Sequence, residues 1–217
     1  MAVTFDNKST AVAAGAASIQ WTHTVSGTNT YLILNLTNDS AFSYSSAAYN
    51  GVALTRRGFV TGPAGVFLEG WDLAGANTGA LTASATVTGG AGAACSAAGT
   101  SYNGVAQANP RTGIVSATDT NVTNHNLSVA SQANGLVFGT ILTITGALSA
   151  GASQTVRFSV SAGTVQMTGC TKAGGATVSL SWTSAAISSA MLAFAISDTA
   201  AGAVTLVPNR MMLSTGT

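Results

Sequence analysis

The chain has 217 residues, of which only 6% are charged, against roughly a quarter in an average soluble domain. The formal net charge is +1, and no basic cluster exists beyond Arg56-Arg57, so the basic surface that nucleic-acid binding requires is not expected. A hydrophobic share of 47% with so little net charge also argues against disorder. The longest apolar run, residues 191–196, is far shorter than the roughly 18–20 residues of a membrane span, so we expect no span.

Residues 1–8 lack the basic start and apolar run of a secretion signal, and we expect none in this sequence. Charge repulsion normally keeps protein copies apart, and a domain close to neutrality tends to associate. The composition therefore favours a component of an assembly, such as a fibre, a shell or an extracellular array.

In chain order, the hydrophobic pattern is that of β-strands. Residues 19–25 alternate between apolar and polar types, which predicts a strand with one buried face. Residues 31–36 form a continuous apolar run, which predicts a strand that is buried on both faces or lies in a sandwich core. Similar strands are expected at 66–73, 135–142, 176–182 and 189–196, and weaker ones at 3–6, 41–49, 53–60, 80–88, 94–103, 125–130, 152–160 and 163–169.

Turn signals separate these strands, and no helix is convincing. Asn-Gly pairs at 50–51, 103–104 and 134–135 suit tight turns, because both residues tolerate positive φ. Residues 11–18 have helix propensity but no apolar stripe and no good cap. We therefore predict an all-β, two-sheet antiparallel sandwich, jelly-roll-like, with about a dozen short strands. It would form a single domain over residues 1–197, tandem small domains being the alternative.

One internal similarity has two interpretations. Residues 48–53 and 101–106 both contain Tyr-Asn-Gly-Val-Ala, 53 positions apart. Each copy predicts an aromatic anchor followed by a tight turn. The pair is either the trace of a duplicated half-domain or two similar hairpin corners.

Residues that could perform catalysis are few. His23 lies in an alternating strand and is expected to be a core or cross-strand histidine, and His125 a surface or turn residue. The carboxylates of Glu69 and Asp72 should point to opposite faces of one strand, whereas a glycosidase pair must converge. Cys95 and Cys170 are interpreted as buried free thiols, with a disulfide as the alternative. We predict no enzyme, no catalytic residue, no cofactor and no metal site.

Several motifs resemble a β-sandwich module of bacteriophage structural proteins and bacterial extracellular proteins. The similarity covers roughly residues 3–197 and is carried by Phe5-Asp6, W-T-H-T-V at 21–25, Y-N-G-V-A-L-T at 49–55, W-D-L at 71–73, Y-N-G-V-A-Q-A-N-P at 102–110, G-A-S-Q-T at 151–155 and V-S-L-S-W-T at 178–183. The sequence departs from the family at Ala106, where an acidic residue is usual, and in the strand from Thr30, which lacks the usual Arg. Both departures remove charge and put a charged surface or ion contact of the family in doubt here.

The resemblance implies a virion structural protein: a capsid decoration protein, a head fibre or a tail-associated protein, located in the virion. Its partners would be other virion proteins or copies of itself. The alternative is an extracellular or cell-surface adhesion module that binds a surface, such as a host glycan. Exposed aromatics would then stack on sugars, the candidates being Tyr44, Tyr49, Trp71 and Tyr102, although we favour each of these as a core or corner anchor.

Residues 198–217 are expected to form a C-terminal extension or arm. A small-residue link leads to an apolar segment for which the finished domain has no obvious place. The candidate partner-binding residues are Val204, Leu206, Val207, Met211, Met212 and Leu213. They either add to a neighbouring subunit by strand addition or fold back as an edge strand of their own sandwich. Pro208 would limit pairing to one side, and methionines adapt to irregular grooves.

Overall fold

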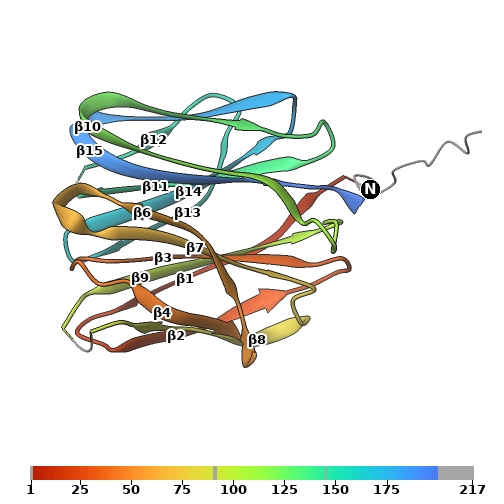
Figure 1. Ribbon diagram of the computed structural model, residues 1–217, viewed down its shortest axis with the longest axis horizontal. Helices are drawn as coiled ribbons and strands as arrows, with labels where there is room; N and C mark the ends of the chain where they lie inside the picture. Colours follow the sequence, from red (N-terminus) through yellow and green to blue (C-terminus); the bar gives the residue numbers. More distant parts are fainter. Residues whose placement is uncertain (1, 90–91, 145, 200–217) are drawn as a thin grey trace, which may run out of the picture.

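Three antiparallel sheets, stacked as layers, form the part of the chain that the computed structural model describes, residues 2–89, 92–144 and 146–199. Figure 1 shows the layers edge-on, with the N-terminal strands in the lower half and the C-terminal strands above them. Within these residues the helical structure is one short 3-10 turn, η1 (Pro63–Gly65). The predicted all-β antiparallel sandwich is confirmed.

The N-terminal half is itself a sandwich of two sheets. The middle sheet has the strand order β1 (Thr4–Ala13), β9 (Cys95–Asn103), β3 (Tyr31–Asn38), β7 (Phe67–Ala74) and β6 (Thr55–Thr61). The small sheet has the order β2 (Ser18–Val25), β8 (Gly79–Val87), β4 (Tyr44–Tyr49) and β5 (Val52–Ala53). The chain moves between the two sheets as it proceeds, as in other antiparallel sandwiches.

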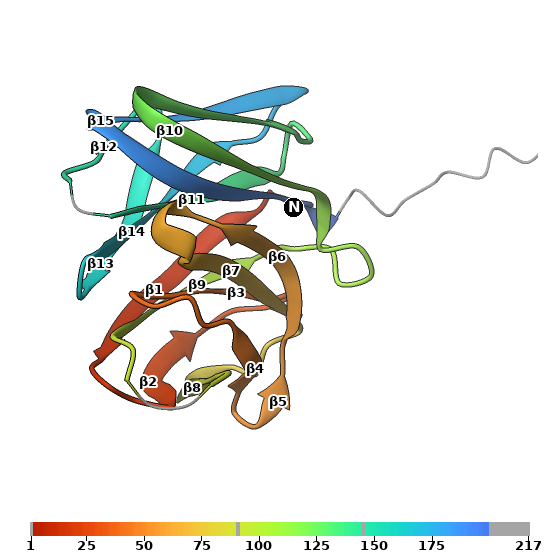
Figure 2. The same ribbon diagram turned by 60° about the vertical axis from the view of Figure 1, so that its left-hand side comes forward.

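The C-terminal half adds a third sheet, which is one more than the sequence predicted. The large sheet has the order β10 (Arg111–Ala130), β15 (Thr177–Ile196), β11 (Leu136–Ile144), β14 (Val165–Ala173) and β13 (Thr155–Ala162), and β12 (Ser149–Ala150) also pairs with β15. It covers the face of the middle sheet that the small sheet leaves free (Figure 2). Every residue of β3 is buried as a result, which confirms the two-sided burial predicted for residues 31–36.

Separate apolar cores fill the spaces between the layers. Leu34 and Trp71 lie in the core between the small and middle sheets. Ile33 and Phe194 lie in the core between the middle and large sheets. Because side chains alternate between the faces of a strand, the neighbours Ile33 and Leu34 serve different cores.

Glycines allow the middle and large sheets to approach closely. A Cβ atom added at Gly58 would collide with the side chain of Leu192, and one added at Gly70 would collide with Phe194 as well as Leu192. The large apolar side chains of β15 thus rest directly on the backbone of β6 and β7. These two glycines are a packing requirement and need no unusual φ angle.

The longest strands, β10 and β15, form a ribbon that bends back over the large sheet. Between the Asn124–Thr183 pair and the Val122–Ile187 pair, β15 has three residues where β10 has one. Such a bulge bends a strand pair and increases its twist. We call residues 124–130 and 177–183, beyond this bend, the flap. Figure 1 shows the bend at the left, where β10 and β15 both turn back.

The flap encloses a third core against the outer face of the large sheet. Leu180 and Trp182 of the flap pack together with Ile141, Cys170 and Met191. Residues 176–182 and 189–196, predicted as two strands, are therefore the two halves of β15. Residues 111–124, to which no strand was assigned, form the first part of β10.

The two Tyr-Asn-Gly segments are similar corners with different turns. Tyr49 and Tyr102 are both fully buried anchors. Asn50 and Gly51 both have positive φ and close the hairpin between β4 and β5. At the second corner only Gly104 has positive φ, and Val105 then pairs with Asp198.

Removal of the largest flap side chain should destabilise the protein strongly. Trp182 is fully buried, and deletion of a buried Trp costs roughly 3–5 kcal/mol. We expect Trp182→Ala to lower the free energy of urea unfolding by that amount. The exposed neighbour Thr183 provides the control, since Thr183→Ala should change it by less than about 0.5 kcal/mol. A loss below about 1 kcal/mol for Trp182→Ala would show that the flap does not pack as described.

Candidate functional site

The predicted partner-binding residues lie outside the described part of the chain. Val204, Leu206, Val207, Met211, Met212 and Leu213 all follow Thr199, the last described residue. Their role therefore stays a prediction. The described chain is still attached to the stack at its end, because Asp198 pairs with Val105 and the Thr199 amide donates to the Gly104 carbonyl.

The aromatic residues considered for sugar stacking are all buried. Tyr44, Tyr49, Trp71 and Tyr102 are at most 6% exposed. Tyr44 donates from its hydroxyl to the Thr37 carbonyl oxygen, at 2.7 Å. The favoured interpretation of these rings as core or corner anchors is therefore confirmed, and the alternative, that they stack on a glycan, is wrong for all four.

The six acidic side chains, all of which lie in described segments, make internal contacts or are buried. Glu69 accepts from the Tyr44 amide at 2.7 Å and from Trp71 Nε1 at 3.0 Å. Burial raises the pKa of Glu69, although these donors and Arg56 act in the opposite direction. Asp39 accepts from the Ala94 amide. The remaining acids are Asp6, which accepts from Ser26 and Ser101, Asp72 and Asp119, which form ion pairs, and Asp198, which is buried.

Asp72 connects the middle sheet to the large sheet. Its Oδ1 lies 2.8 Å from Arg57 Nε on β6, and its Oδ2 lies 3.0 Å from Arg111 Nε on β10. The Tyr31 hydroxyl donates to Oδ2 at 2.7 Å, and burial together with this carboxylate raises the pKa of Tyr31. The predicted divergence of the two carboxylates is confirmed, since Asp72 and Glu69 bind partners on opposite faces of β7.

His23 is a core histidine, as predicted, between the middle and small sheets. It is fully buried, with Nδ1 2.7 Å from Ser9 Oγ, and that oxygen also accepts from Trp21 Nε1 at 2.9 Å. Burial lowers the pKa of His23 to about 4, and the nearby Asp6 carboxylate only partly offsets this. The imidazole is therefore neutral at pH 7.

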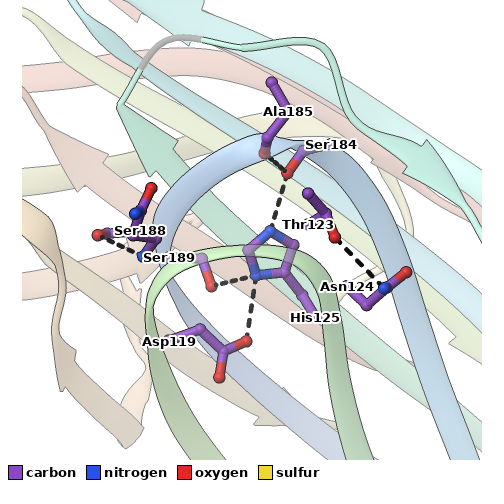
Figure 3. Close-up of polar contacts among 9 residues, drawn as sticks. Asp119, Thr123, Asn124, His125, Ser184, Ala185, Ser188 and Ser189 are labelled. Carbon is purple, nitrogen blue, oxygen red and sulfur yellow. Dashed lines mark hydrogen bonds and ion pairs between the residues drawn. The ribbon is translucent and has the colours of Figure 1, made fainter.

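His125 is fully buried inside the ribbon bend, so its assignment as a surface or turn residue was wrong. Its Nδ1 lies 2.9 Å from Ser189 Oγ and 3.1 Å from Asp119 Oδ2, and its Nε2 lies 3.0 Å from Ser184 Oγ. Figure 3 shows the imidazole between β10 and β15. We call Asp119, His125, Ser184 and Ser189 the histidine bend.

The order of contacts in the histidine bend matches a Ser-His-Asp triad, but the hydrogen-bond directions do not. A catalytic serine must give its proton to the imidazole. Ser184 Oγ lies 2.5 Å from the Ala185 carbonyl oxygen, which can only accept, so Ser184 donates there. In this geometry the Ser184 proton points to that carbonyl oxygen and not to Nε2. The nearest hollow is lined by Asp119, Ser188 and Ser189 rather than by Ser184.

The histidine bend instead stabilises the local fold. His125 comes from the flap, whereas Asp119 and Ser189 come from the part of the ribbon before the bend. One imidazole thus links side-chain oxygens from both sides of the bend. Buried polar groups without such partners would cost roughly 1–3 kcal/mol each.

The two cysteines are not expected to be reactive. Cys95 and Cys170 are buried free thiols, as predicted, in different cores. Burial raises the pKa of each thiol, which disfavours the reactive thiolate. Within residues 2–89, 92–144 and 146–199, no group of three His, Cys, Asp or Glu side chains could hold a metal ion. No helix in these same segments has the length and apolar character needed to cross a membrane.

Comparisons of the chain with protein-family models, with curated proteins and with solved structures find no match. The sequence missed the histidine bend, because its members come from separate parts of β10 and β15. The one available signal was the polar residues around His125, which interrupt the strand pattern on both strands.

The low pKa of His23 makes stability dependent on pH. The unfolded chain takes up a proton near pH 6.5, whereas the folded protein takes it up only near pH 4. The free energy of unfolding should therefore fall as the pH is lowered through this window, by about 3 kcal/mol at pH 4, at 1.36 kcal/mol per pKa unit. Urea unfolding between pH 7 and pH 4 measures this loss.

Two variants assign the pH effect to His23. His23→Gln should reduce the loss markedly, whereas His125→Gln, which retains His23, should preserve most of it. An equally large loss in His23→Gln would contradict the assignment.

Proposed function

We propose that this protein is a non-enzymatic structural component of a bacteriophage virion that acts through contacts with copies of itself or with other virion proteins. The motif resemblance supports the virion assignment. One observation carries the assembly role. The acidic side chains contact other groups of the same molecule or are buried between its sheets, so they add little negative charge to the surface.

Most basic side chains in the described segments are engaged as well. Arg57 and Arg111 pair with Asp72, and Arg56 lies 3.6 Å from Glu69. Arg157 donates to Thr171 Oγ1 and lies over the Phe5 ring, and Lys172 donates to the Ser179 carbonyl oxygen. Little charge is left to repel a neighbouring copy, and low effective charge favours association.

The outer strand positions are small and uncharged over long stretches. The exposed positions in the first half of β10 include Thr112, Ser116 and Thr118. Those of β2 are Ser18, Gln20, Thr22 and Thr24. Such flat surfaces carry little side-chain entropy and allow another protein to approach closely. They suit repeated subunit contacts.

An adhesion module remains a second candidate, and Phe59, which is 44% exposed, is a ring that it could use. Stacking of sugars on exposed rings is its usual basis, and the four rings considered are buried. We therefore favour the virion location over an extracellular one.

The hydrogen bond from Ser184 to the Ala185 carbonyl oxygen gives a direct test of the non-enzymatic role. Incubation of the protein with a fluorophosphonate probe should leave Ser184 unmodified, because its proton is committed to the Ala185 carbonyl oxygen. Mass spectrometry of the intact protein measures this, with a serine hydrolase as the positive control. Stoichiometric labelling that is lost in both Ser184→Ala and His125→Gln would contradict the proposal.

The C-terminal arm should be needed for assembly and not for folding. Deletion of residues 200–217 retains the contacts of Asp198 and Thr199, so the truncated protein should keep its melting temperature within a few degrees. It should fail to join the assembly that the full chain forms, as measured by sedimentation. If the truncated protein unfolds, or still assembles at full occupancy, the hypothesis of an assembly arm is wrong.

The virion assignment itself is tested by stoichiometry. Particles purified by density gradient should contain the protein in a fixed copy number. A protein that is absent from such particles and instead binds a glycan array as a free monomer would favour the adhesion alternative.

A further inference from the structure

The outer edge of β10 is an open strand edge. Along residues 111–119, β10 pairs with β15 on one side and has no strand partner on the other among the described residues. An unpaired edge presents backbone N–H and C=O groups to any strand that fits. We call residues 111–119 the β10 edge.

Proteins usually protect exposed strand edges with charge or proline, and the β10 edge has little of either. Residues 112–118 contain no charged residue and no proline. Most other outer strands are different: β1 contains Asp6 and Lys8, β6 contains Arg56 and Arg57, and β13 contains Arg157. β5 is uncharged and exposes Val52, but it is only two residues long. β2 also lacks charge, but its exposed side chains are all polar. The β10 edge combines an uncharged stretch, residues 112–118, with an apolar side chain, Ile114, that is 38% exposed.

Shallow hollows lie at both ends of the β10 edge. Arg111, Thr112, Gly113 and Ile114 line the first. The second lies between the end of the edge and the turn after β6, and its lining includes Pro63, Thr118 and Ser189. Space for additional side chains therefore exists along the strand.

The C-terminal segment has the composition of a matching strand. Residues 204–207, Val-Thr-Leu-Val, alternate so that Val204 and Leu206 would share one face. They contain no charge, and Pro208 directly after them would end the pairing. A four-residue strand with two aliphatic side chains on one face fits an edge with Ile114 at its centre.

The geometry at Thr199 favours a segment from a second copy. Ile196 is paired with Arg111, so the chain leaves β15 at the start of β10. The contacts of Asp198 and Thr199 then direct it toward Gly104 and Val105, which follow β9 of the middle sheet. A segment that returned along its own β10 edge from there would run parallel to β10, and parallel pairing is the less stable kind. A second copy can offer the segment antiparallel.

We propose that the β10 edge is the receptor for residues 204–207 of a second copy of this chain, which add as an antiparallel strand with Leu206 beside Ile114. This inference rests on the proposed function and specifies the partner of the arm. The donated segment and the receiving edge are different surfaces. A one-way exchange, repeated, builds a ring or a filament, whereas a reciprocal exchange between two copies closes a two-fold dimer.

A charge at the centre of the β10 edge should block the contact. Ile114→Lys should fold normally, because Ile114 is already exposed, and should reduce self-association at least tenfold in sedimentation experiments. Val156→Lys is the matched control: Val156 is 48% exposed on β13, the opposite outer strand of the large sheet, and this change should leave association unaltered. Wild-type association of Ile114→Lys would overturn the inference.

Cysteine cross-linking locates the segment without relying on loss of function. The natural cysteines are buried, so a Val204→Cys protein mixed with a Ser116→Cys protein should form a disulfide-linked heterodimer under mild oxidation. A mixture of Val204→Cys with Val156→Cys should not. Linkage to Val156→Cys alone, or an intramolecular link in a chain carrying both Val204→Cys and Ser116→Cys, would overturn the inference.

The two proposals fail in different ways. If deletion of residues 200–217 abolishes association but Ile114→Lys does not, the arm binds elsewhere, and only the receptor assignment is wrong. If the deletion has no effect on association, residues 200–217 do not act as an arm, and the assignment of the β10 edge as their receptor is wrong as well.

Discussion

The central strands of the middle sheet have no face for solvent, and the rest of the structure follows from this constraint. β3 is buried over its whole length, and β9 over all but its last residue. A sheet buried on both faces needs a cover on each side, and the backbone of its strands must find every hydrogen-bond partner within the sheet. The small sheet supplies one cover from the same half of the chain. The other cover requires the whole C-terminal half, which explains why the two halves form one stack.

The scarcity of charge is the second organising feature. So few ionised side chains could all lie in solvent, but several of them form contacts between strands or between sheets. Asp72 receives Arg57 from its own sheet and Arg111 from the large sheet, so one carboxylate links two layers. Buried pairs of this kind contribute modestly to stability, because desolvation offsets much of their attraction. Their clearer effect is to fix how the layers are positioned.

Prediction from sequence succeeded where hydrophobic periodicity determines structure. The continuous run at 31–36 predicted burial on both faces, and alternation around His23 predicted a core histidine; both were confirmed. Periodicity failed for residues 111–124, because the outward Thr and Ser and the inward Gly113, Val115 and Ala117 differ too little in hydrophobicity. The third sheet was not predicted, because the alternation of apolar and polar residues along a strand does not depend on whether two or three sheets are stacked. The histidine bend depends on the pairing of distant strands, which no local pattern encodes.

The position of β15 has a consequence for how the protein is made. β15 lies between β10 and β11 in the large sheet, although it is the last strand of the chain. During synthesis, β10 and β11 emerge early but cannot join until residues 177–196 have left the ribosome. Until then the upper face of the middle sheet, including Tyr31, Ile33 and Leu68, has no complete cover. Such delayed long-range pairing is slow and exposes apolar surface. We therefore expect chaperones that recognise exposed apolar β-structure to bind nascent chains of this protein before β15 is complete.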